Sequence, residues 1–169
     1  MNFVQELWWK QARAEYELLR HLRQKSVAAC HQLHYLQMVT EKLGKAYFWR
    51  SLRPPGKSHA SFVKFLQALA NRSSADQHRI PRLLGFQRAD AFENWIRSSA
   101  PLAYSLERLA PALEGDDGPN AEYPWPRKSP VTTPIEHAFP LWDQLTYSGP
   151  GRRFLKVIDH AVEQFPNYA

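Results

Sequence analysis

The sequence is poor in cysteine and glycine and has no long apolar run. One cysteine, Cys30, among 169 residues excludes an internal disulfide and a four-cysteine zinc site. None of the seven glycines builds a GxGxxG loop, or a GxxxxGK loop followed by Ser or Thr, so these phosphate-binding loops are excluded. No run approaches the roughly 18 apolar residues of a transmembrane helix, and residues 1–6 do not begin a secretory signal. We therefore expect a single soluble, cytoplasmic domain over residues 1–169, with no membrane partner.

The 22 Lys and Arg residues outnumber the 16 Asp and Glu, and this surplus is unevenly distributed. Residues 1–60 carry 10 basic and 4 acidic side chains, whereas residues 114–147 carry 2 basic and 6 acidic ones. A basic body attracts polyanions, because phosphates pair with Lys and Arg and release their counterions. The charge therefore favours contact with nucleic acid or nucleotide, although a solvated basic face would produce the same pattern.

Apolar residues recur at helical spacing along most of the chain, and no segment alternates as a strand would. The spacing predicts helices over residues 3–25, 27–52, 61–71, 89–113 and 152–164, with single turns near 80–84 and 141–145. Asn2 and Ser26 are the expected N-caps of the first two helices. The fold class is thus predicted to be all-α, an up-and-down bundle of four or five helices that opens with an antiparallel hairpin.

The first predicted helix has two contrasting faces. We expect its core face to be a broad apolar stripe, made of residues at helical spacing and their neighbours: Phe3, Leu7, Ala14, Leu18 and Leu22, with Val4, Trp8, Ala12 and Leu19 beside them. Another side combines aromatic and arginine residues, which we interpret as a partner surface: Trp9, Arg13, Tyr16 and Arg20. Cys30, on the next helix, is expected to be a buried core thiol.

Residues 114–140 differ in composition from the helical segments. A turn cluster at residues 115–120 precedes several prolines, yet large apolar side chains such as Trp125 and Phe139 lie between them. A disordered linker seldom carries so many large apolar groups. We therefore predict an ordered, proline-rich loop over the helices, and then a break in the chain at residues 148–151.

The helical hairpin resembles that of HEPN domains. Residues 9–19 are similar to the family's opening helix, with Tyr16 or Glu15 at the position of its usual aspartate. Residues 29–46 resemble its second helix, in which small and aromatic residues precede a Q-x-x-E-K-x-x-K-A pattern. Gln37, Glu41, Lys42, Lys45 and Ala46 preserve the end of that pattern.

This resemblance implies a compact four- or five-helix bundle that forms a homodimer. Many HEPN proteins are metal-independent ribonucleases with an R-x(4–6)-H motif in a late helix. Here that motif corresponds to Arg153 and His160, which are separated by six residues. Other members lack catalysis and bind RNA, a nucleotide or a partner protein, often a nucleotidyltransferase.

Arg153 and His160 are the candidate catalytic residues. Seven positions are just under two helical turns, so both side chains project from one face. A histidine can move a proton near neutral pH, and the arginine fork suits a scissile phosphate. Two functions remain open, a binding module without catalysis and a toxin-like, metal-independent endoribonuclease.

A weaker alternative is a metal-containing bundle enzyme. His31, His34 and Glu41 lie at helical spacing and could place ligands on one face. However, the sequence has no E-x-x-H motif to supply the second half of such a site. We therefore expect no metal and no cofactor.

Overall fold

The structure of the chain is a computed structural model that describes residues 1–49, 61–70, 79–111, 118–125 and 132–168. Within these ranges the fold is all-α, as predicted, and the nearest approach to a strand is an isolated bridge between Trp125 and Thr132. No helix in the described ranges is long and apolar enough to cross a bilayer. The elements are α1 (Phe3–Arg23), α2 (Ala29–Phe48), α3 (Ser61–Ala70), α4 (Arg79–Leu83), α5 (Ala89–Glu107), α7 (Pro140–Tyr147), α8 (Gly149–Glu163) and the 3₁₀ helix η2 (Phe165–Asn167).

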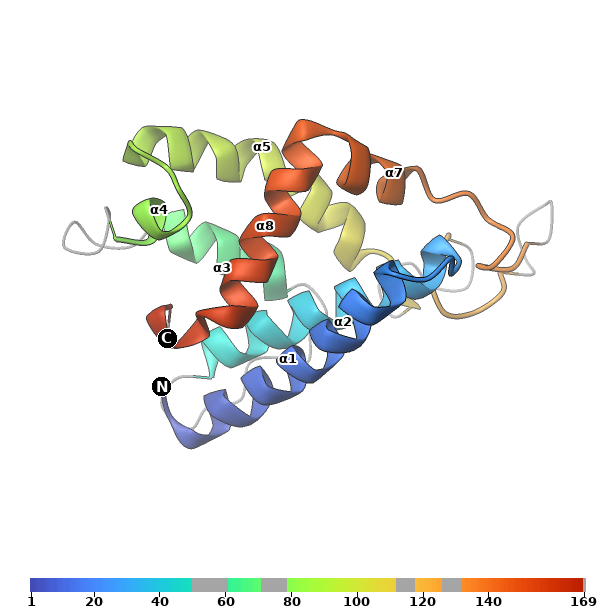
Figure 1. The fold of residues 1–169 in the computed structure, drawn as a ribbon, viewed down its shortest axis with the longest axis horizontal. Coiled ribbons are helices and arrows are strands. Elements are labelled where there is room, and N and C mark those ends of the chain that lie inside the picture. The colour runs from blue at the N-terminus through green and yellow to red at the C-terminus, as the bar shows by residue number, and fades with distance from the viewer. Residues whose placement is uncertain (50–60, 71–78, 112–117, 126–131, 169) are drawn as a thin grey trace.

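Helices α1 and α2 form the predicted antiparallel hairpin (Figure 1), and α8 contacts both of them. Asn2 caps α1 as expected. Its side chain accepts a hydrogen bond from the backbone N–H of Gln5 at 2.9 Å, and the Gln5 side chain accepts from the Asn2 backbone N–H. The Asn2 side chain also donates to the carbonyl of Trp49 at 2.8 Å. One residue thus caps the first helix and ties it to the end of the second.

The predicted start and end of the second helix are wrong. Helix α2 begins at Ala29, and its N-cap residue Ala28 makes no side-chain cap, so Ser26 does not cap it. The turn from α1 occupies the intervening residues, with a hydrogen bond from the Val27 N–H to the Lys25 carbonyl. At the other end Trp49 has left the helical conformation, and residues 50–52 of the predicted helix lie outside the described ranges.

The prediction for α1 is partly wrong, because Ala12 and Leu19 of the expected stripe are buried whereas its central residues are exposed. The buried side consists of Gln5, Ala12, Tyr16 and Leu19. The expected core residues Phe3, Leu7 and Leu18 are 72%, 48% and 41% exposed. The reason is that α1 lies against both α2 and α8, and its polar aromatic groups find hydrogen-bond partners there. The hydrophobic pattern alone therefore placed Tyr16 on the partner surface, whereas the structure buries it.

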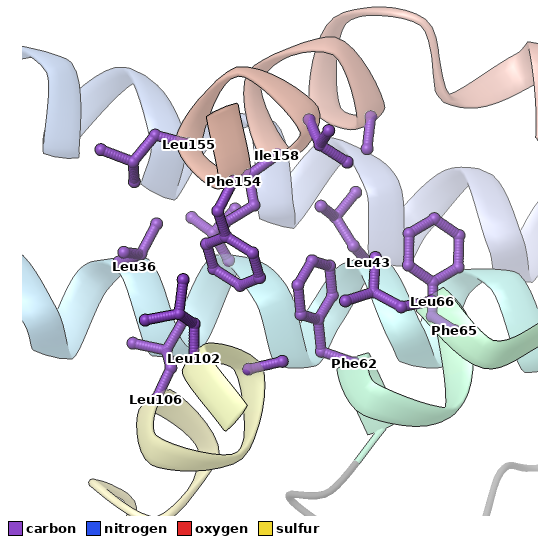
Figure 2. Close-up of a cluster of buried hydrophobic side chains, with 14 of the residues drawn as sticks. Leu36, Leu43, Phe62, Phe65, Leu66, Leu102, Leu106, Phe154, Leu155 and Ile158 are labelled. Carbon is purple, nitrogen blue, oxygen red and sulfur yellow. The ribbon is translucent and has the colours of Figure 1, made fainter. Parts of the chain in front are cut away.

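The core lies where α2, α3, α5 and α8 meet (Figure 2). Phe62 of α3 and Phe154 of α8 pack edge to face, with ring centroids 5.9 Å apart, a favourable aromatic geometry. Gly44 permits the close approach of α2 and α3, because a Cβ added there would lie 2.6 Å from the backbone carbon of Ser61. Cys30 is buried, as expected.

Helix α5 ends at Glu107, earlier than predicted, and residues 112–113 of the predicted helix lie outside the described ranges. The Glu107 side chain is only 2% exposed. One of its carboxylate oxygens accepts the backbone N–H groups of Phe62 at 2.7 Å and Val63 at 3.0 Å. These are N–H groups of the first turn of α3, which no helical carbonyl can satisfy. Glu107 is therefore a cap supplied by another helix.

The predicted break at residues 148–151 is confirmed at Ser148, which is extended between α7 and α8, whereas residues 149–151 already belong to α8. The Ser148 hydroxyl accepts the Gly151 N–H at 2.9 Å, a side-chain N-cap. Of the predicted proline-rich loop, residues 118–125 and 132–139 are described, and the rest lies outside the described ranges. Trp125 and Phe139 are buried in the described part, whereas Tyr123 and Ile135 are exposed.

Candidate functional site

Arg153 and His160 line the same cleft, which has a volume of about 800 Å³. The cleft lies along α8, and Leu83 at the end of α4 and the following Leu84 contribute to its wall. Lys156 lines it between the two predicted residues. The structure thus brings the predicted pair together on one concave surface, while their catalytic role stays a prediction.

The amphipathic sequence of α8 explains why these side chains face the cleft. Ser148 fixes the start of the helix, and the apolar residues that follow are buried: Phe154, Leu155, Val157, Ile158, Ala161 and Val162. Burial of that face turns the charged positions outward. The outward positions are Arg152, Arg153, Lys156, Asp159 and Glu163.

The end of α4 holds Arg153 in place. Gly85 adopts φ +75°, a left-handed conformation that favours glycine at a helix C-terminus. The N–H of Gly85 donates to the Arg82 carbonyl at 2.9 Å, and the N–H of Phe86 donates to the Pro81 carbonyl at 2.8 Å. This turn directs Phe86 back toward α8, where the guanidinium carbon of Arg153 lies 3.9 Å from the ring centroid. The stack orients the arginine without neutralising its charge.

A tyrosine orients His160. The imidazole Nδ1 and the hydroxyl of Tyr168 are 2.6 Å apart. Burial lowers the pKa of His160, against the opposing effect of Asp159, so the ring is neutral near pH 7. Burial also raises the pKa of Tyr168, which remains a phenol. With Nδ1 engaged, Nε2 is the ring nitrogen that can serve a ligand in the cleft.

Helix α1 supports the acidic side of the cleft. Asp159 accepts the Tyr16 hydroxyl at 3.0 Å, and burial together with Asp159 raises the pKa of Tyr16 far above its usual value. Glu163 lies 3.7 Å from the Arg20 guanidinium. Asp159 keeps its charge, because a neutral phenol donates to it, whereas Arg20 partly compensates Glu163. Arg152, Arg153 and Lys156 therefore outnumber the two carboxylates that line the cleft.

Three site residues escaped prediction from the sequence. Tyr16 was assigned to a partner surface, and nothing in the sequence singled out Phe86 or Tyr168. The signal at Phe86 is the glycine before it, which marks a helix end. Tyr16 and Tyr168 carry no local signal, because tertiary contacts alone bring them to the cleft.

The alternative metal ligands are not brought together. His31 is exposed, His34 lies 3.5 Å from Glu122, and Glu41 binds Lys45 and accepts a hydrogen bond from Gln37. Among the described residues, no group of three His, Cys, Asp or Glu could hold a metal ion.

The basic surplus of the hairpin is also partly neutralised. Lys42 is largely buried in an ion pair with Glu15 at 2.8 Å, and Lys45 pairs with Glu41. Arg50 and Arg53 of the same basic run lie outside the described ranges. The cations available to a ligand are therefore more evident on α8 than on the described part of α2.

Scans against protein families, curated proteins and solved structures found no match to this chain. The residues of the cleft therefore carry the functional assignment. They combine an oriented arginine, an exposed lysine and a neutral histidine. Such a set can bind a phosphate diester, and its histidine can accept a proton from a neighbouring hydroxyl.

Proposed function

We propose that the cleft along α8 binds the phosphate backbone of RNA. The observation that carries this proposal is that Arg153, Lys156 and His160 line one cleft at positions i, i+3 and i+7. Cations in a concave site concentrate a polyanion and gain from the release of its counterions.

The charges of the cleft favour a phosphate ligand. Neither Arg153 nor Lys156 makes an ion pair with a described residue, whereas Asp159 and Glu163 are engaged by α1. The arginine fork matches two phosphate oxygens, and its stack on Phe86 fixes the plane of that fork. The neutral His160 adds a donor or an acceptor at Nε2.

The resemblance to HEPN domains supports the same proposal. An antiparallel hairpin within an all-helical fold agrees with that family's architecture, and the R-x6-H pair lies in a late helix. As further parts of the proposal, the chain forms a homodimer and pairs with a nucleotidyltransferase-type protein. Mass measurement in solution tests the first, and co-purification with such a protein tests the second.

The second candidate function is a metal-independent endoribonuclease. It is favoured by the lowered pKa of His160, which supplies a neutral base near pH 7. In this reaction the 2′-oxygen attacks the adjacent phosphorus, and Nε2 takes the 2′-hydroxyl proton. The bond from phosphorus to the 5′-oxygen breaks and that oxygen takes a proton from water, which leaves a 2′,3′-cyclic phosphate and a 5′-hydroxyl. Arg153 would stabilise the charge on the phosphate oxygens during the attack.

Binding is tested by titrating a labelled single-stranded RNA in chelator at several salt concentrations. Arg153→Ala and Lys156→Ala should each weaken binding about tenfold and reduce the salt slope by about 1. Lys10→Ala is the matched control, since Lys10 is exposed on α1 and pairs only with Glu6 in the described ranges. An equal loss in the Lys10 variant would show that net charge, not the cleft, binds RNA.

Cleavage is tested with the same RNA by looking for a cyclic phosphate end. His160→Ala should abolish any cleavage while retaining most of the binding. Cutting by this variant at the wild-type rate would remove His160 from the reaction. Cleavage that occurs only when a divalent metal is added would instead favour the metal-dependent alternative.

A further inference from the structure

A second hollow of about 660 Å³ adjoins the cleft, and Arg153 lines both. It is formed by residues 85–88, which connect α4 to α5, and by one side of α5. We propose that this α5 hollow receives an adenine base of the RNA whose phosphate is bound at Arg153. This inference rests on the proposed function and adds a base preference to it.

The position of Arg153 connects the two sites. Its guanidinium lies over Phe86, and Phe86 lines the hollow. A phosphate held by Arg153 therefore lies at the boundary between the cleft and the hollow. The nucleoside on one side of that phosphate can then enter the hollow while the backbone continues along α8.

The hollow differs from the cleft in its chemistry. Its one other lining cation, Arg88, is held by both oxygens of Asp90, at 2.9 and 2.5 Å. The lining therefore has little free charge, which suits a neutral base better than a second phosphate. Its aromatic residues Phe86 and Trp95 are only 6% and 8% exposed and lie at the base of its lining.

Two side-chain amides of the hollow supply the hydrogen bonds that would recognise the base. Gln87 and Asn94 both line the hollow, are exposed, and make no side-chain hydrogen bond with a described residue. An Asn or Gln amide presents a donor beside an acceptor, which matches the N6 and N7 edge of adenine. Bases of single-stranded RNA are free to expose that edge. Adenine offers such a donor–acceptor pair on two edges, N6 with N7 and N6 with N1, whereas uracil has a single N–H and can pair in this way with one amide at a time. Two amides in the hollow therefore predict a preference for adenine.

The indole of Trp95 lies beneath these amides. Its Nε1 is buried without a hydrogen-bond partner among the described residues. The adjacent Ser98 hydroxyl donates to the Trp95 carbonyl at 2.8 Å, so its oxygen can still accept. The hollow therefore combines polar groups above an apolar floor, the usual composition of a small-molecule site.

The test compares the affinities of the full chain for oligoadenylate and oligouridylate of equal length. We expect the wild type to bind oligoadenylate about tenfold more tightly. The Gln87→Ala, Asn94→Ala double variant should lose this preference and bind oligouridylate as before. Gln11→Ala, an exposed amide on α1, is the matched control and should keep the preference. Thermal melting checks that each variant is folded.

The outcomes separate the two proposals. Equal wild-type affinity for both oligonucleotides, or an equal loss of both in the double variant, would overturn the base site and leave phosphate binding intact. Failure of the wild type to bind either oligonucleotide would overturn RNA binding and the base site together. Displacement of oligoadenylate by AMP, with the same sensitivity to the double variant, would support an adenine site whose ligand is a mononucleotide.

Discussion

Glu107 is the position at which one substitution tests the packing of the fold most directly. Its buried carboxylate accepts two N–H groups from the first turn of α3, although the residue itself lies at the end of α5. Glu107→Ala removes this acceptor, whereas Glu107→Gln replaces it with an amide oxygen of nearly the same shape. The two variants therefore separate the hydrogen bonds from the charge.

The expected losses follow from the geometry. Each buried donor left without a partner costs about 1–3 kcal/mol, and Glu107→Ala leaves two of them, at Phe62 and Val63. Removing a carboxylate that burial disfavours offsets part of this cost. We expect a decrease in the free energy of unfolding of about 3 kcal/mol for alanine, and of about 1 kcal/mol or less for glutamine.

Urea unfolding followed by circular dichroism measures these differences. Glu93→Ala is the control on the same helix, since Glu93 is partly exposed and only 3.9 Å from the Arg97 guanidinium. Such exposed pairs contribute about 0.5 kcal/mol or less. Equal losses in the alanine and glutamine variants of Glu107 would refute its role as an acceptor for α3.

The same residue predicts a pH dependence. Burial raises the pKa of Glu107 above 4.5, against the opposing effect of the two N–H groups and Lys64. The folded state therefore holds the proton more tightly than the unfolded chain. Its contribution to stability is fully present below pH 4.5 and is lost as the pH rises through the folded pKa. Glu107→Gln has no such loss, so its stability relative to the wild type should increase from pH 4.5 to pH 7.

Two further predictions concern the contacts of α1 and α2. Tyr16→Phe removes the hydrogen bond to Asp159 and should lower the free energy of unfolding by about 1 kcal/mol in urea titration, and an unchanged value would mean that water replaces the hydroxyl fully. Gly44→Ala forces a Cβ against Ser61 and should cost about 1–3 kcal/mol. Gly149→Ala meets nothing within 4 Å and is its control, so similar melting of both variants would contradict the close packing of α2 and α3.

The helices could be predicted because their apolar spacing is local, but several boundaries could not. The start of α3 is completed by Glu107 from α5, and α8 begins where glycine and proline suggested a break. In both places the groups that satisfy the helix end decide its position. The residue composition around a helix boundary does not identify these groups.

Only part of the candidate site could be predicted from the sequence. Arg153 and His160 share a helix, so their common face follows from helical geometry. Phe86 and Tyr168, which orient them, reach the cleft through the turn after α4 and through η2. The wrong prediction for Tyr16 has the same origin, since Tyr16 is buried where its partner Asp159 lies on another helix.

The contacts between α1 and α8 also have a consequence for the order of folding. Tyr16 and Asp159 are 143 residues apart, and the indole of Trp9 donates to the carbonyl of Val162, 153 residues away. Contacts of such long sequence separation carry a large loop-closure cost and slow the folding steps that need them. Synthesis delivers α1 first and α8 much later, so a nascent chain carries no assembled cleft. The cleft that we propose to bind RNA would thus form only once the described helices have come together.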